Sequence, residues 1–262
     1  MIYCIRKIDK AKILSYNESF KIASYCSTLL SGNDKEIAKA RKIVIHVLNN
    51  WGSIPSETYP IWTDIIEAVG FYPYIEKNKE TMIIRSLSDE VRQKSHLSKY
   101  LSSTYLHKEQ KILSDILLSK KNVIASAPTS FGKSLLIEEL VASGKYHNIV
   151  IIQPTLALLD ETRLKLKKYS TNFKIIVRTT QPAATDKGNL FLLTAERVME
   201  YNQLPKIDLL IIDEFYKLSL KRLDERADTL NNAFLKIVGM HDSKFYFLGP
   251  NIDGITDGFA KK

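Results

Sequence analysis

The chain has 262 residues, 45% of them hydrophobic and 26% charged, so it is long enough for one large domain or two modest ones. No apolar run approaches the ~20 residues of a membrane-spanning helix, and the early charges at the N-terminus exclude a signal peptide, so we expect no membrane partner. The net charge of +9 suits a polyanionic partner such as nucleic acid. Two cysteines without ligand-like spacing favour reduced thiols and a cytoplasmic location.

The first part of the chain, residues 1–95, has the pattern of an α-helical accessory domain. From residue 11 to about residue 74, apolar positions recur at three- and four-residue spacing. Nothing in this part carries chemistry, and we expect its aromatic side chains to serve core packing rather than base stacking. The expected apolar faces consist of Ile22, Tyr25, Cys26, Leu29 and Leu30 on one helix and of Ile43, Val44, Val47 and Leu48 on the next, with Trp62, Tyr72 and Tyr74 as the aromatic residues.

The second part, residues 96–262, alternates short β-branched runs with amphipathic stretches. Such alternation predicts an α/β fold, in which helices cover both faces of a parallel sheet. Ligand sites in these sheets lie at the carboxyl ends of the strands, and each candidate motif below follows a strand. The expected strands are residues 122–126, 148–153, 173–179, 190–194, 209–213 and 244–248.

A loop with the sequence APTSFGKS, residues 127–134, lies between the first of these strands and a helix. Its backbone N–H groups and the following helix N-terminus are suited to bind phosphate. Lys133 would reach the β- and γ-phosphates of a nucleotide, and the hydroxyl of Ser134 would hold Mg²⁺. Because Ala127 stands where the strict motif has glycine, an ordinary strand-to-helix turn is the alternative. The loop residues expected to bind the nucleotide are Thr129, Ser130, Phe131, Gly132, Lys133 and Ser134.

Two adjacent acids, Asp213 and Glu214, end the apolar run of residues 209–212. Carboxylates at the end of a buried strand are costly unless they bind something. With a phosphate-binding loop upstream, Asp213 would hold Mg²⁺ and Glu214 would act as general base on the attacking water. The alternative is a strand that ends at the surface with two solvated acids.

The ordered set of motifs resembles the first RecA-like domain of superfamily-two helicases, the DEAD/DEAH-box and Ski-like group. The resemblance covers about residues 96–251 and implies a RecA-like fold, ATP and Mg²⁺ as cofactors, and an ATP hydrolase that acts on nucleic acid. The matching segments are APTSFGKS at 127–134 (motif I), QPTLAL at 153–158 (Ia), LTAER at 193–197 (Ib), DEFY at 213–216 (II) and LGPN at 248–251 (III).

The resemblance also implies further site residues. Gln110 precedes Lys133 by the spacing of the family's adenine-reading glutamine, and the nearby Tyr105 would stack on adenine. In the family, motifs Ia and Ib bind the backbone of one DNA or RNA strand, which implies contacts from Thr155, Thr194 and Arg197.

Several residues depart from the family pattern. Leu156 replaces an arginine that usually touches the nucleic-acid backbone, so we expect Arg163 or Lys165 to take that role. Phe131 replaces a small loop residue, and Phe215 with Tyr216 and Gly-Pro-Asn at 249–251 alter motifs II and III. This combination resembles bacterial antiphage-defence helicases of the Hachiman type.

The residues after Asn251 leave no room for the second RecA-like domain that such helicases need. We therefore interpret the chain as the N-terminal part of a longer ATP-dependent helicase or translocase, weakly active or inactive alone. Two alternatives stay open at this point. One is a non-catalytic nucleotide-binding adaptor whose helices dock a partner protein such as a nuclease. The other is a phosphate-loop ATPase that does not act on nucleic acid.

Overall fold

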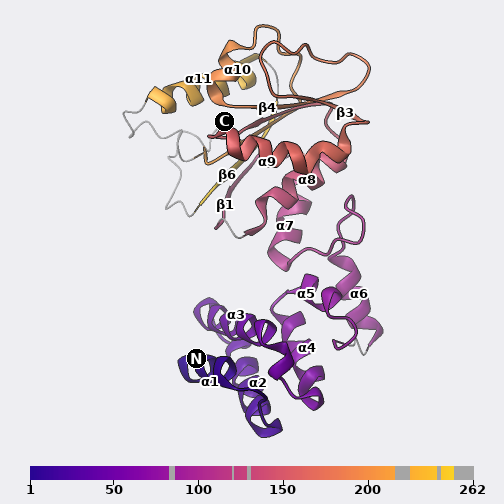
Figure 1. Ribbon diagram of the computed structural model, residues 1–262, viewed down its shortest axis with the longest axis vertical. Coiled ribbons are helices and arrows are strands. Elements are labelled where there is room, and N and C mark those ends of the chain that lie inside the picture. The colour runs from indigo at the N-terminus through magenta and orange to yellow at the C-terminus, as the bar shows by residue number, and fades with distance from the viewer. Residues whose placement is uncertain (83–85, 120, 129–130, 216–224, 241–242, 251–262) are drawn as a thin grey trace. The chain divides into compact units, whose positions relative to one another are not determined.

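The computed structural model describes residues 1–82, 86–119, 121–128, 131–215, 225–240 and 243–250 (Figure 1). The chain forms two compact units, Met1–Ile112 and Leu113–Lys262, which divide within helix α7 (Lys108–Leu117). The domain boundary after residue 95 stays a prediction.

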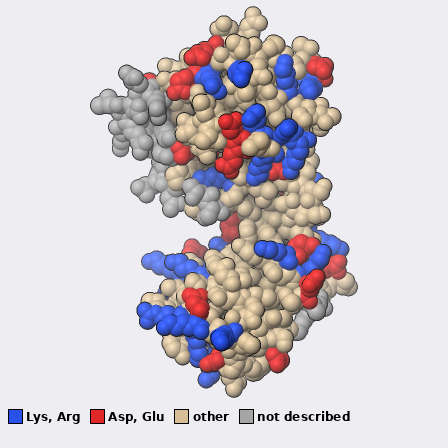
Figure 2. Space-filling model, viewed as in Figure 1, with Lys and Arg blue, Asp and Glu red and all other residues tan. Residues whose placement is uncertain are grey.

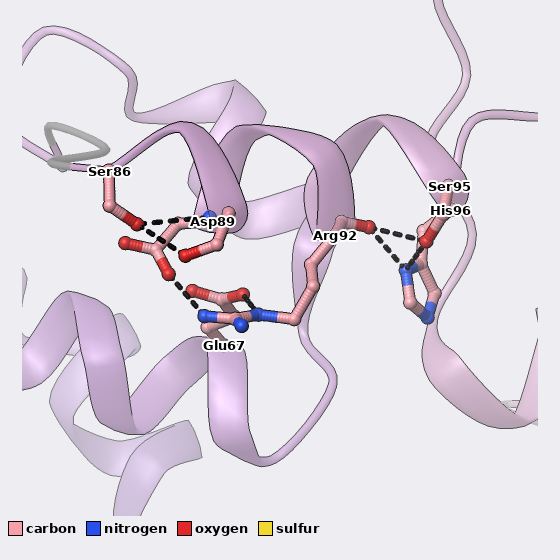
Figure 3. A network of polar contacts seen from close by, with 7 residues as sticks. Glu67, Ser86, Asp89, Arg92, Ser95 and His96 are labelled. Atoms are coloured by element: carbon pink, nitrogen blue, oxygen red, sulfur yellow. Dashed lines mark hydrogen bonds and ion pairs between the residues drawn. The ribbon is translucent and has the colours of Figure 1, made fainter.

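The first unit is helical, as the periodicity of its sequence predicts. Helices α2 and α3 both begin with a capping box, in which Ser15 and Asn33 accept backbone N–H groups while Glu18 and Glu36 accept in return. Figure 3 shows the polar contacts of α6. The helices are α1 (Ile2–Lys10), α2 (Tyr16–Leu30), α3 (Asp34–Asn49), α4 (Tyr59–Ala68), α5 (Tyr72–Lys77), α6 (Leu87–Ser95) and the start of α7, with 3₁₀ turns at Trp51–Ser53 and Ser56–Thr58.

The core of this unit includes most of the apolar positions expected from sequence. Trp62 is fully buried, and its indole N–H donates to Ser19 Oγ at 2.9 Å, which satisfies the one polar group of the ring. Tyr72 is also buried, whereas Tyr74 is 38% exposed and contacts the rings of Phe71 and His107. The expectation was wrong for Tyr25, which is 39% exposed because it lies at the edge of the apolar stripe of α2. The two cysteines are free thiols, and burial raises the pKa of Cys26 to about 12.

The second unit contains a six-stranded, entirely parallel sheet in the order β1-β6-β5-β2-β4-β3. Each expected strand is present, although β3 ends at Ile176 rather than at residue 179, and the RecA-like α/β class is confirmed. Because every strand runs the same way, all the carboxyl ends meet at one edge. The strands are β1 (Val123–Ser126), β2 (Asn148–Ile152), β3 (Phe173–Ile176), β4 (Gly188–Leu193), β5 (Leu209–Asp213) and β6 (Lys244–Gly249).

Helices cover both faces of this sheet, which explains the continuous apolar strands (Figure 1). On β5, Leu209 and Ile211 face the layer of α8 (Lys133–Ala142) and α9 (Leu156–Leu166), whereas Leu210 and Ile212 face α10 (Ala195–Glu200) and α11 (Glu225–Met240). Strands β2 and β4 alternate in the same way. The two apolar layers fix the register of the sheet and therefore the positions of the residues at its carboxyl edge.

Candidate active site

The described ends of the loop after β1 are suited to the approach of a phosphate. The N–H of Ala127 donates to Gly249 O at 2.9 Å, so the start of the loop is held to the end of β6. Gly132 has a φ of 81°, a conformation that favours glycine, and it leads directly into α8. The first N–H groups of an α-helix lack partners within the helix, so the start of α8 is suited to bind an anion. Of these groups, the N–H of Leu135 donates to Gly132 O at 3.0 Å. Thr129 and Ser130 lie outside the described residues.

A small pocket at the carboxyl edge of the sheet brings together three residues that the sequence singled out. Lys133, Ser134 and Asp213 all line it. A hydroxyl and a carboxylate are hard oxygen ligands of the kind that Mg²⁺ prefers, and an ammonium group is suited to phosphate. The residues present therefore fit a magnesium–nucleotide complex. The rest of the lining consists of Ile137, Gln153, Glu161, Thr162, Lys165 and Leu166.

Burial shapes the chemistry of Asp213. Desolvation raises its pKa above the ordinary aspartate value, and a hydrogen bond from Gln153 and the positive charge of Lys133 oppose that rise. Gln153 is held in turn by Thr162, whose hydroxyl donates to Gln153 Oε1 at 2.8 Å. Because its pKa is raised, Asp213 begins to take up a proton at higher pH than an ordinary aspartate. Cation binding at this carboxylate should therefore weaken as the pH falls toward that pKa.

The residue after Asp213 has an unusual backbone conformation. Glu214 has a φ of 61°, which is rare for a residue with a side chain, and its N–H donates to Asp213 Oδ1 at 3.0 Å. Such conformations cost about 1 kcal/mol or more and cluster at functional sites. Phe215 is buried and stacks on Phe247 of β6 with 5.7 Å between ring centroids, so this departure from the DEAD/DEAH pattern has a packing role. Tyr216 lies outside the described residues.

Lys165 on α9 lines the pocket, whereas the sequence suggested it as a contact to the nucleic-acid backbone. Its Nζ donates to Ser134 Oγ at 3.0 Å and lies 3.9 Å from the buried carboxylate of Glu138. Arg163, the other residue suggested for that role, forms an exposed ion pair with Asp160. A cationic group thus contacts the same hydroxyl that would bind Mg²⁺.

The three residues expected at a nucleic-acid backbone follow β2 and β4. Thr155 Oγ1 accepts the N–H of Leu158 at 3.3 Å and so caps α9. Thr194 occupies the N-cap position of α10 without making a side-chain cap. One guanidinium nitrogen of Arg197, Nη1, donates to Val177 O at 2.9 Å, which leaves its other donors for a phosphate.

Gln110 and Tyr105 belong to the first compact unit. Gln110 is buried, and its Oε1 accepts the N–H of His107 at 2.9 Å near the start of α7. Tyr105 pairs with Leu97 in an isolated β-bridge and packs against the helical core. Their roles toward adenine stay predictions.

Sequence reasoning missed Gln153, Thr162 and Lys165 as pocket residues. Gln153 stands at the end of β2, so the rule that sites lie at strand ends was a signal for it. Thr162 and Lys165 are three residues apart on α9, and only the packing of α9 beside α8 brings them to the pocket. Asn251 of motif III lies outside the described residues.

Two comparisons with known proteins agree with this fold. A family model described as "DEAD/DEAH box helicase" matches residues 107–240, and the chain belongs to that family. A second model, "Anti-bacteriophage protein B N-terminal domain", matches residues 1–87. The chain is 31% identical over 259 residues to "Anti-bacteriophage protein B" of Escherichia coli (strain K12), an alignment that covers 94% of this chain and 35% of that protein. The chain thus spans about a third of this relative's length.

The described residues contain neither a membrane-spanning helix nor a cluster of metal-ligating side chains. None of the helices there combines the length and apolarity that crossing a bilayer needs. Within the same residues, no group of three or more His, Cys, Asp or Glu side chains is arranged to hold a metal ion.

Proposed function

We propose that this chain is the N-terminal part of an ATP-dependent helicase or translocase that binds ATP–Mg²⁺ and the backbone of one nucleic-acid strand. The observation that carries the proposal is the shared pocket of Lys133, Ser134 and Asp213 at the carboxyl edge of the sheet. The antiphage relative supports a role in defence against phage. A cytoplasmic location and a nuclease partner belong to the same proposal and are predictions.

Each residue at the edge has a role in this proposal. The N–H groups at the start of α8 and the Lys133 ammonium bind the β- and γ-phosphates. The Ser134 hydroxyl and the Asp213 carboxylate hold Mg²⁺, which supplies charge neutralisation at the phosphate oxygens when bound. Glu214 accepts a proton from the attacking water. Gln153 keeps Asp213 oriented through its hydrogen bond.

The nucleic-acid part of the proposal is tested by the affinity of a labelled single strand. We expect Thr194→Ala combined with Arg197→Gln to weaken binding about tenfold, because a charge-assisted hydrogen bond to phosphate is lost. Fluorescence anisotropy with DNA and RNA oligonucleotides of random sequence measures the affinity. Lys206→Gln is the control, since Lys206 lies before β5, at the opposite edge of the sheet. Equal affinity of the double variant and the control would contradict these contacts.

Lys165 should oppose Mg²⁺ binding, because its ammonium contacts the hydroxyl that the cation needs. We expect Lys165→Met to lower the Mg²⁺ concentration for half-maximal ATP binding about fivefold, as removal of a partly solvated like charge is worth roughly 1 kcal/mol. Titrations of Mg²⁺ at a fixed ATP concentration measure the Mg²⁺ concentration at which ATP binding is half-maximal. Lys167→Met removes an exposed charge from the neighbouring turn and should change nothing. A higher Mg²⁺ requirement in Lys165→Met would show instead that Lys165 assists binding.

A further inference from the structure

The positive charge of the helical unit is concentrated in its first 50 residues. That segment carries nine Lys and Arg against four Asp and Glu, a net charge of +5, whereas residues 51–112 carry eight of each. In Figure 2, the blue side chains of this unit gather where Figure 1 places α1 and α3, while blue and red alternate over α6. The excess is therefore local to three helices.

The acids of this segment are engaged in folding. Asp9 accepts from His46 and from Asn50, at 2.9 and 3.2 Å. Glu18 pairs with Lys7 at 2.8 Å and closes the capping box of α2, and Glu36 closes that of α3. Asp34 lies in the first turn of α3, where it complements the helix dipole. Lys7 pairs with Glu18, and Arg41 pairs with Glu109 of α7. The acids of the segment leave its other cations without an ion pair in the part of the chain that the structure describes.

Three lysines of α3 form one stripe. Lys35, Lys39 and Lys42 are exposed and follow each other at four- and three-residue spacing, so they lie within roughly 60° of one another around the helix. His46 continues the stripe by one turn and contacts Asp9 of α1. The stripe is therefore continuous with the exposed surface of α1 beside Asp9.

Helix α1 extends this surface. Arg6 and Lys10 are both exposed and lie one helical turn apart. In the sequence they flank Asp9. No ion pair engages Lys35, Lys39, Lys42, Arg6 or Lys10 within the described part of the chain. By contrast, Arg92 of α6 pairs with both Glu67 and Asp89 (Figure 3). Tyr3, one turn before Arg6, is 71% exposed and offers a ring for base stacking.

We propose that this α1–α3 face, defined by Arg6, Lys10, Lys35, Lys39 and Lys42, is a second binding surface for nucleic acid outside the motor motifs. It binds the phosphate backbone without sequence preference, as unpaired cations on a rigid helix do. The proposal rests on the proposed function in so far as the partner is a polynucleotide. It assigns a role to the helical unit, in which the sequence motifs predicted no chemistry.

The test compares two variants of the whole chain that remove the same charge. Lys35→Gln, Lys39→Gln and Lys42→Gln are combined in one, and Lys77→Gln, Lys79→Gln and Lys94→Gln, in the same unit, form the matched control. Affinity for a labelled single strand is measured without ATP as salt is varied. We expect the face variant to bind about tenfold more weakly and its logarithmic salt dependence to be shallower by about 2, since each lost phosphate contact removes ~0.7. Melting temperatures confirm that both variants fold.

Other outcomes separate this proposal from the motor function. In one outcome, the double variant of Thr194 and Arg197 keeps full affinity while the face variant loses it. That result would contradict the proposed contacts of Thr194 and Arg197 with nucleic acid and would support the α1–α3 face as the binding surface. If face variant and control have the same salt dependence, the proposal is overturned. Vesicles with phosphatidylserine provide a further arm, because loss of vesicle binding with unchanged oligonucleotide binding would mark the face as a membrane surface and overturn the proposal.

Discussion

Glu214→Gln is expected to lower the rate of ATP hydrolysis about 10²- to 10⁴-fold while ATP affinity stays within about threefold. The amide has nearly the same shape as the carboxylate but cannot accept a proton from water. The backbone supports this role, because the left-handed conformation of Glu214 and its N–H contact with Asp213 Oδ1 hold the residue directly beside the carboxylate proposed to bind Mg²⁺.

Single-turnover hydrolysis of γ-labelled ATP, with the chain in excess, measures this effect even when turnover is slow. Glu200→Gln is the matched control, since Glu200 is an exposed acid at the end of α10. Unchanged hydrolysis in Glu214→Gln would remove Glu214 from the mechanism. A large loss of ATP affinity in the same variant would show that Glu214 has a binding role instead.

Lys133→Ala is expected to weaken ATP binding about 100-fold or more, because the phosphates would lose a charge-assisted contact in a partly enclosed pocket. The loop itself should survive, since Gly132 keeps its conformation and Ala127 its bond to Gly249. The rise in melting temperature that ATP and Mg²⁺ produce in the wild type should therefore vanish. Lys206→Ala, a change at the opposite edge of the sheet, should keep that rise.

The sheet was predictable from the sequence because its strands are buried on both faces. Continuous apolar runs such as residues 209–212 have few other structures available, and a parallel sheet places their ends together. The start of α8 was predictable from the Gly-Lys-Ser motif, because Gly132 adopts the left-handed conformation that favours glycine directly before the helix.

The rest of the pocket depends on packing between elements distant in sequence. Lys165 reaches Ser134 across 31 residues, and no local pattern distinguishes it from the other cations of α9. Phe215 departs from the family motif, and only the structure shows that it fills space beside Phe247. The spacing of the lysines of α3 can be read from the sequence. That their stripe continues onto the surface of α1 follows only from the contact of His46 with Asp9 in the structure.

The central claim is that Lys133, Ser134 and Asp213 form one ATP–Mg²⁺ site. Calorimetric titration of ATP into this chain, with Mg²⁺ and then with a chelator, tests it most directly. We expect one nucleotide per chain, binding that depends on Mg²⁺, and no detectable heat of binding in Lys133→Ala. Binding that survives both the chelator and the loss of Lys133 would contradict the claim, and so would the absence of any binding to the wild-type chain.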